Sequence, residues 1–269
     1  MPELPEMETY RQQLTRLIQG APITGAEVTR PKSLNVEPDS FIRKLTGNRI
    51  VRIDRRAKHL LFHLVSGEVL LLHLMLGGWM FYGTEDEKPD RTTQVVIHFG
   101  TKHLYFIGLR LGYLHMHTRP EVDLLLGKLG PEPLDSSFTF PQFQQVLKSK
   151  KSNLKLSFVD QSFLSGIGNC YSDEICFYAG ILPLRKLSSL TEEEQNRLFQ
   201  AMRSVLLEAI QFGGYINEPL FVGDRLTGQF DAKCRVYDRE GEPCLRCGHP
   251  LIKTEVSSRK CFYCANCQA

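Results

Sequence analysis

The sequence lacks any apolar segment long enough to cross a membrane. Its longest apolar stretch, residues 68–83 (EVLLLHLMLGGWMFYG), is interrupted by His73 and by glycines. It also lacks a basic and apolar targeting segment at its start, because the first ten residues, MPELPEMETY, are acidic. We therefore expect a soluble, cytosolic protein with no membrane partner.

A strong charge imbalance is missing as well. Lys and Arg number 33 against 30 Asp and Glu, which gives a formal net charge of +3 and a pI of about 8.4. Such a mildly basic chain neither requires nor excludes a nucleic-acid partner. No internal repeat or low-complexity tract is visible, and 269 residues that are 42% hydrophobic suffice for one or two domains with a substantial core.

The pattern along the chain predicts an α+β protein. A helical pattern covers residues 6–20, and residues 22–118 mix short apolar runs with alternation, which is typical of strands and hairpins. The proline-rich GPEPLD at residues 130–135 predicts a linker, and helical patterns follow at residues 138–149 and 188–214. We expect Ser189 or Thr191 to cap the longer of these helices, and domains at residues 1–130, 131–233 and 234–269.

Six of the eight cysteines lie between Cys234 and Cys267. Two C-x2-C pairs, separated by sixteen residues, fit a tetrahedral four-cysteine Zn²⁺ site on a β-hairpin, with Cys244, Cys247, Cys264 and Cys267 as ligands. Cys261 also precedes Cys264 with two residues between, so it competes with Cys267; we favour Cys267. Cys170, Cys176 and Cys234 are expected to be ordinary buried thiols.

Arg259 lies near the expected hairpin tip, beside Ser257, Ser258 and Lys260. A zinc hairpin alone is weak evidence for a function, because a role as a structural element or protein-binding module accounts for it equally well. An arginine on a rigid tip, however, is suited to reach a phosphate or a DNA groove.

The start of the chain has two interpretations. Pro5, Glu6 and Glu8 suit the first turn of a helix. Alternatively, once Met1 is removed, Pro2 has a free secondary amine with a pKa of about 8, so it is a usable nucleophile near neutral pH. Its addition to the anomeric carbon of a deoxyribose expels the base and leaves an iminium ion, from which elimination cuts the strand. Neighbouring carboxylates can move the protons that this chemistry requires.

Several segments, in the same order, resemble the formamidopyrimidine-DNA glycosylase / endonuclease VIII family of base-excision repair enzymes. They are PELPEMET (residues 2–9), RRAKHLLF (55–62), LGPEPL (129–134), KLSFVDQSFLSGIGNCYSDEICFYAGILP (155–183), and VYDREGEPCLRC with RKCFYCANCQ (236–247 and 259–268). The resemblance implies an N-terminal β-sandwich domain with a leading helix, then a helical domain with a helix-two-turns-helix and a zinc finger.

The resemblance also implies a function: a monomeric bacterial repair glycosylase with AP lyase activity, acting on double-stranded DNA that contains a damaged base or abasic site. It would flip the damaged nucleotide out of the duplex and be associated with the nucleoid. Pro2 would be the nucleophile, Glu3 would protonate the sugar, and Glu6 would support the N-terminal amine. Lys58 would bind phosphate and assist proton transfer.

On the same basis, Asn169 and Arg259 would hold the phosphates flanking the flipped nucleotide, and we expect Lys155 to face DNA. Three leucines occupy the positions with which the family fills the gap left by that nucleotide, where methionine, arginine and phenylalanine are usual: Leu76, Leu109 and Leu111.

Two further differences from the family's sequence pattern concern substrate binding. The family's phosphate-binding histidine is replaced around residues 92–94, and Glu218-Pro219 replaces the usual threonine or arginine in the loop after Gly214. The carboxylate of Glu218 would favour bases that present hydrogen-bond donors or positive charge. We therefore expect this protein to prefer other damaged bases than the 8-oxoguanine enzymes of the family do. The alternatives are a relative that binds or bends DNA without excising 8-oxoguanine-type lesions, and a zinc-hairpin protein-interaction module.

Overall fold

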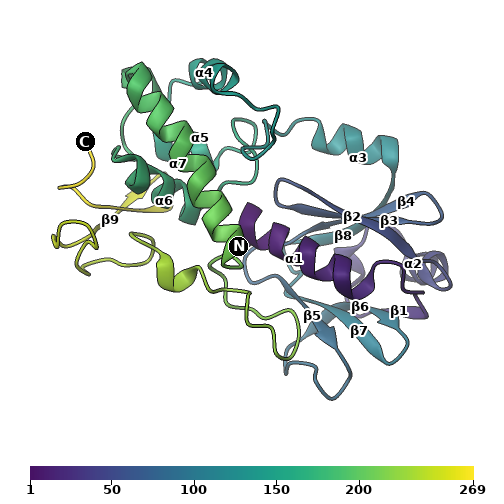
Figure 1. Ribbon diagram of the computed structural model, residues 1–269. Coiled ribbons are helices and arrows are strands. Elements are labelled where there is room, and N and C mark those ends of the chain that lie inside the picture. The colour runs from purple at the N-terminus through teal and green to yellow at the C-terminus, as the bar shows by residue number, and fades with distance from the viewer. The chain divides into compact units, whose positions relative to one another are not determined.

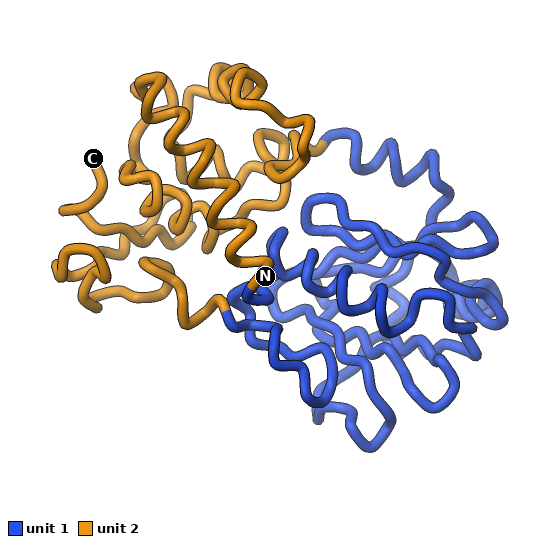
Figure 2. The backbone as a smooth tube through the Cα atoms, viewed as in Figure 1, with its two compact units in different colours: residues 1–128, 212–229 blue, residues 129–211, 230–269 orange.

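The computed structural model describes all residues, 1–269, and these divide into two compact units (Figure 2). The first contains Met1–Lys128 and Phe212–Gln229, and the second contains Leu129–Gln211 and Phe230–Ala269. The predicted domains at 1–130, 131–233 and 234–269 follow chain order. In the structure, the segment Phe212–Gln229, which follows the long helix, belongs to the first unit. The cysteine hairpin belongs to the same unit as the helices. None of the helices combines the length and the apolar character that a membrane span requires.

The first unit begins with α1 (Leu4–Ile18), which lies beside two sheets (Figure 1). A capping box between Glu3 and Glu6 starts the helix, and the chain leaves it at Gly20, whose φ of 83° is left-handed. The predicted helix at residues 6–20 is therefore confirmed in type and shifted by two residues at each end. Its buried side chains join the core of the unit: Met7, Tyr10, Leu14 and Ile18.

Two four-stranded antiparallel sheets form a sandwich in this unit. One has the order β1-β6-β7-β5, with bounds Gly25–Val28, Thr93–Phe99, Lys102–Ile107 and Trp79–Gly83. The other has the order β2-β3-β4-β8, with bounds Ile50–Arg56, His59–Leu64, Glu68–His73 and Tyr113–Thr118. Side chains from both sheets meet in one apolar core, as the alternating sequence pattern predicted. The shorter helices are η1 (Pro31–Ser33), α2 (Pro38–Leu45) and α3 (Arg119–Leu126).

The second unit combines helices with a β-hairpin. Its elements are α4 (Phe140–Lys148), α5 (Leu154–Val159), α6 (Asn169–Ala179), η2 (Leu187–Ser189), α7 (Glu192–Gln211), η3 (Asp231–Lys233), β9 (Ile252–Val256) and β10 (Arg259–Tyr263). Thr191 caps α7: its backbone N–H donates to the Glu194 carboxylate at 2.9 Å, and its hydroxyl accepts from the Glu194 N–H at 3.3 Å. Of the two predicted caps, the structure selects Thr191.

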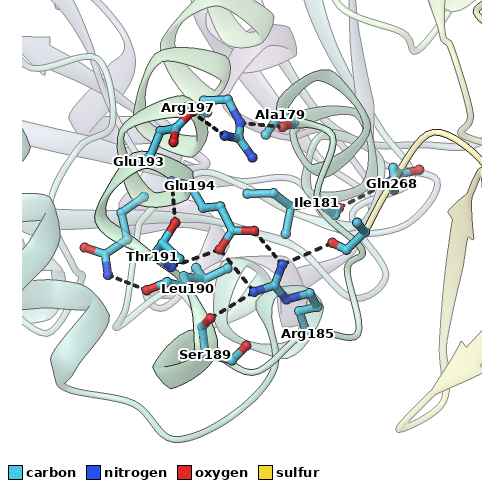
Figure 3. Close-up of polar contacts among 12 residues, drawn as sticks. Ala179, Ile181, Arg185, Ser189, Leu190, Thr191, Glu193, Glu194, Arg197 and Gln268 are labelled. Carbon is cyan, nitrogen blue, oxygen red and sulfur yellow. Dashed lines mark hydrogen bonds and ion pairs between the residues drawn. The ribbon is translucent and has the colours of Figure 1, made fainter.

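The connection between α6 and α7 also holds the last residues of the chain (Figure 3). The Gln268 side-chain amide donates to the Ile181 carbonyl at 2.9 Å. The Leu182 N–H donates to the Ala269 carbonyl at 3.0 Å. Arg185 donates to Glu194 at 2.6 Å and to the Ala269 carbonyl at 3.3 Å. The last residues of the chain, which follow the cysteine hairpin, are thereby fixed to the helices of their own unit.

Candidate active site and nucleic-acid interface

The first residues of the chain are buried, although chain ends are usually exposed. Pro2 is buried, and Glu3 and Glu6 are only 2% and 3% exposed. The Glu3 N–H donates to Glu6 Oε2 at 2.7 Å, while the Glu3 side chain accepts from the Glu6 N–H. Helix capping and the chemical interpretation are therefore compatible, because the capping box holds the chain in place directly beside Pro2.

The other oxygen of Glu6 is held by a segment more than 200 residues away in the sequence. The Tyr215 N–H donates to Glu6 Oε1 at 2.8 Å. Gly214, at a φ of +76°, passes so close that an added Cβ would overlap the Glu6 carboxylate. Only glycine fits there, for reasons of both space and backbone conformation.

Lys58 lies in the two-residue turn between β2 and β3, where Arg56 pairs with His59. Ala57 in this turn has a φ of 53° and is held in the left-handed region. Lys58 is only 3% exposed, and burial lowers its pKa, while the Glu3 and Glu6 carboxylates oppose that shift. The structure thus brings the predicted Glu3, Glu6 and Lys58 into one electrostatic cluster, with a lysine that gives up its proton more readily than an exposed one.

His73 is a neighbour of this cluster that the sequence patterns did not single out. Its Nδ1 lies 3.2 Å from the Lys58 carbonyl oxygen, and its ring stacks on His59 with centroids 4.3 Å apart. Only the cross-strand register of β3 and β4, which pairs residues 59 and 73, reveals this proximity. Tyr215 and Gly214 were missed for the same reason, since their partner is distant in the sequence.

Two of the three predicted wedge leucines are exposed. Leu76, in the loop after β4, is 74% exposed, and Leu111, in the loop after β7, is 68% exposed. The two loops pack closely: a Cβ at Gly108 would overlap the Gly77 carbonyl. The exposed side chains of Leu76 and Leu111 are therefore carried by neighbouring loops.

The prediction that Leu109 also belongs to the wedge is wrong. Leu109 is 0% exposed and packs in the core of the sandwich. Its backbone N–H donates to Gln94 Oε1 at 2.9 Å, and Gly108, at a φ of 71°, turns the chain inward before it. Gln94, one of the residues in the place of the family's histidine, thus has a structural role in holding this loop.

The segment after α7 is pinned to α1 and the sandwich. One carboxylate, Asp224, accepts from the Gln13 side chain at 3.0 Å and from the Leu220 N–H at 3.0 Å. Leu220 is fully buried, and its carbonyl accepts from the Tyr82 N–H at 2.6 Å. Burial raises the pKa of Glu218 in this segment, and Arg91 opposes the shift.

In the second unit, Asn169 is the first residue of α6 and follows Gly168 at the N-cap. Gly166, at a φ of 90°, shapes the turn before it. Backbone N–H groups at the first turn of a helix are a favourable environment for phosphate oxygens. The position of Asn169 is thus compatible with its predicted role.

Lys155 does not face DNA, contrary to the prediction. Its side chain is 0% exposed, and its Nζ lies 2.6 Å from Asp173 Oδ1. It also donates to the Asn169 carbonyl at 2.8 Å and to Ser172 Oγ at 3.0 Å. The three donors of the ammonium group are therefore used inside the protein.

The four predicted zinc ligands gather at the base of the β9–β10 hairpin. Their Sγ atoms all lie within 4.8 Å of one another, with 3.9 Å between Cys244 and Cys267 and 3.5 Å between Cys247 and Cys264. These separations fit a tetrahedral Zn²⁺ ion with Zn–S bonds of about 2.3 Å. Cys261 is outside this cluster and fully buried, and burial raises its pKa to about 12. The competition between Cys261 and Cys267 is thereby resolved.

The remaining cysteines are buried, as expected: Cys170, Cys176 and Cys234. Arg259 is exposed and begins β10, directly after a turn in which Ser257 and Ser258 have φ angles of 49° and 61°. Two consecutive left-handed residues are typical of a tight type I′ hairpin turn. The tip that carries Arg259 is therefore sharply defined, as predicted.

Comparison with known proteins agrees with this arrangement. Residues 1–114 match the formamidopyrimidine-DNA glycosylase N-terminal domain, residues 129–219 its H2TH domain, and residues 241–269 the zinc finger found in FPG and IleRS. Formamidopyrimidine-DNA glycosylases of Listeria innocua and Carboxydothermus hydrogenoformans are each 35% identical over the whole of both chains. This chain belongs to the formamidopyrimidine-DNA glycosylase family.

Solved structures of family members are also similar. The MutM (Fpg) protein from Thermus thermophilus is 36% identical, with a TM-score of 0.87 over 99% of this chain and 98% of that one. A Lactococcus lactis Fpg variant in complex with Fapy-dG containing DNA is 30% identical, with a TM-score of 0.91 over 99% of both chains. The Lactococcus lactis protein has also been solved with DNA that contains an abasic site. This likeness favours a repair glycosylase over a DNA-binding relative that does not excise.

Proposed function

We propose that this protein is a DNA repair glycosylase with AP lyase activity and that Pro2 is its nucleophile. The observation that carries the assignment of Pro2 is the buried cluster of Glu3, Glu6 and Lys58 directly beside it. A carboxylate pair and a lysine with a lowered pKa supply the acid and base groups that Schiff-base chemistry needs.

The chemistry begins after removal of Met1, when the Pro2 nitrogen attacks C1′ of the damaged nucleotide. The N–C1′ bond forms while the glycosidic bond to the base breaks, and the proton of the Pro2 amine passes to the departing base. Glu3 then donates a proton to O4′ of the sugar as the nitrogen lone pair opens the C1′–O4′ bond. The product is an iminium ion, which acidifies C2′. Loss of a proton from C2′ and cleavage of the C3′–O bond then cut the strand. Lys58 assists these proton transfers, and Glu6 fixes the backbone of Glu3 so that the nitrogen of Pro2 keeps its place.

In the second unit, Asn169 and Arg259 hold the phosphates that flank the flipped nucleotide. The four-cysteine zinc site shapes the hairpin and takes no part in the reaction. Leu76 and Leu111 fill the gap in the base stack. Because neither leucine can hydrogen-bond to the orphaned base, we expect weak selectivity for the opposite base.

The carboxylate of Glu218 favours as substrate a base that presents hydrogen-bond donors or positive charge. Since the similar proteins named above are bacterial, we place the protein in the bacterial cytosol, at the nucleoid. The unit of Met1–Lys128 and Phe212–Gln229 serves as the catalytic part, and the unit of Leu129–Gln211 and Phe230–Ala269 serves as the DNA-binding part, which includes the zinc finger.

Borohydride trapping tests this proposal. The protein is incubated with a duplex that contains one abasic site, and borohydride reduces the iminium ion to a stable adduct, which mass spectrometry locates on residue 2. Pro2→Gly should trap far less, whereas Glu8→Gln, on the same helix but paired with Arg11 and Arg55, should trap normally. Absence of an adduct with the unmodified sequence, or undiminished trapping by Pro2→Gly, contradicts the assignment.

A further inference from the structure

Two consecutive carboxylates of α6, Asp173 and Glu174, are 0% exposed and bind backbone N–H groups around the zinc hairpin. Glu174 accepts from the N–H groups of Arg235, Val236 and Tyr237, at distances of 2.8 to 3.0 Å. These three residues lead the chain toward the cysteines. Buried carboxylates without such donors would be strongly unfavourable. These bonds therefore hold the segment that leads to the cysteines against α6.

Asp173 makes the connection to the hairpin itself. Its Oδ2 accepts from the Phe262 N–H of β10 at 3.0 Å, while its Oδ1 pairs with Lys155 of α5 at 2.6 Å. One side chain thus joins α5, α6 and β10. The connection is enclosed, because Cys176 and Cys261, which both interact electrostatically with Asp173, are fully buried.

The two predicted phosphate-binding residues lie at the ends of this connection. Asn169 precedes Asp173 by four residues on α6, a rise of about 6 Å. Arg259 precedes Phe262 by three residues on β10, a span of about 10 Å. Both elements are regular, so the bond between Asp173 and the Phe262 N–H sets the separation of Asn169 and Arg259.

Lys155 holds the Asn169 end of the same connection. Its ammonium binds the Asn169 carbonyl at 2.8 Å as well as the Asp173 carboxylate. The backbone at the start of α6 is thereby tied to the side chain that anchors β10. Gln268 forms a second attachment, because its side-chain amide donates to the Ile181 carbonyl (Figure 3). Its side-chain oxygen accepts from the Cys264 N–H, directly after β10.

We propose that Lys155 and Asp173 are positioning residues for DNA binding, which fix Arg259 relative to Asn169 so that the two grip the DNA backbone as a unit. Neither residue touches DNA. The inference rests on the proposed function, in which Asn169 and Arg259 contact phosphates. This role accounts for the burial of Lys155, which lies in a segment that the family resemblance associates with DNA binding.

The test uses the salt dependence of binding by the zinc-loaded protein to a duplex with an abasic-site analogue that cannot be cut. Each phosphate neutralised by a cation contributes about 0.9 to the slope of log affinity against log salt. Arg259→Ala should therefore lower the slope by about 0.9. Lys155→Met should lower it equally, and Arg259→Ala should add no further loss in that background, because the arginine is already misplaced.

Other outcomes of this experiment overturn the inference. If Lys155→Met leaves the slope and the effect of Arg259→Ala unchanged, the ion pair contributes to stability alone. If the two substitutions lower the slope additively, Lys155 contacts DNA directly. If Arg259→Ala leaves the slope of the otherwise unchanged protein intact, the phosphate contact itself is refuted, which identifies the failure as one of the proposed function.

Controls separate misplacement from unfolding. Zinc content and thermal unfolding are measured for each variant. If Lys155→Met does not fold, the double variant Lys155→Met/Asp173→Asn has no unpaired buried charge and undergoes the same test. Lys150→Met is the matched control: it removes an ion pair with Asp160 in which both side chains are 37% exposed, and it should leave the effect of Arg259→Ala intact.

Discussion

Substituting Gly214 by alanine should reduce catalysis by more than its effect on folding stability explains. The chain passes it at a φ of +76°, and a Cβ there would overlap the carboxylate of Glu6. Gly223, in the same segment, has a φ of +89° with no atom within 4 Å of the added Cβ. The two glycine-to-alanine variants therefore share the backbone strain, and only Gly214→Ala adds the collision.

The magnitudes follow from these environments. A left-handed alanine costs about 1–2 kcal/mol, which is the whole effect expected for Gly223→Ala. Overpacking against Glu6 adds about 1–3 kcal/mol to the free-energy cost of Gly214→Ala. If Glu6 moves aside instead, it loses hydrogen bonds from Tyr215 and Glu3, each worth about 1.5–3 kcal/mol because the acceptor is charged.

The activity of Gly214→Ala should fall by at least about tenfold, since about 1.4 kcal/mol of lost positioning already corresponds to that factor. The assay is the single-turnover rate of borohydride trapping on an abasic-site duplex, at a temperature where thermal unfolding shows each variant to be folded. Gly223→Ala should trap at nearly the normal rate. Equal rates for the two variants would refute the idea that the contact between Gly214 and Glu6 positions the N-terminus.

Three further predictions follow from burial. Leu109→Ala should destabilise the protein by about 2–5 kcal/mol in urea unfolding, whereas Leu111→Ala should change stability by less than about 0.5 kcal/mol while weakening excision; similar stability losses would place Leu111 in the core. Cys267→Ser should lose zinc in a metal-content assay, and Cys261→Ser should keep it; the reverse result would exchange the ligand assignment. Burial and the nearby His73 lower the pKa of His59 to about 3. Between pH ~6.5 and about pH 3, this histidine is therefore protonated in the unfolded chain and neutral in the folded protein. Stability should therefore fall by about 1.4 kcal/mol per pH unit on acidification from pH 6.5 toward 3, and urea unfolding of His59→Gln should show a correspondingly flatter profile.

Features that depend on neighbouring residues could be predicted from the sequence. The leading helix, the strands of the sandwich and the cap of α7 are encoded by spacing and capping residues within a few positions of each other. The zinc site is predictable for the same reason, because two C-x2-C pairs each form one local turn. The order of the matching segments then supported the family resemblance, and that resemblance predicted the catalytic roles of Pro2, Glu3 and Lys58.

Burial of individual side chains could not be predicted in this way. Lys155 and Leu109 occupy positions that the family resemblance associates with DNA, and both are fully buried. A lysine is normally exposed unless a partner such as Asp173 offsets its desolvation, and that partner is eighteen residues away on another helix. Leu109 is turned inward by the left-handed Gly108 and by the bond to Gln94.

By itself, the sequence determined the leading helix, the strands of the sandwich, the long helix α7, the metal ligands except for the choice between Cys261 and Cys267, and the chemistry available at Pro2. It did not predict the short helix α2 within the stretch expected to form strands. Only the tertiary structure decided between Cys261 and Cys267, and only it placed Gly214 and Tyr215 against Glu6. The physical reason is distance along the chain. Backbone geometry fixes contacts between near neighbours, whereas contacts across two hundred residues exist only because packing of the whole unit brings them together.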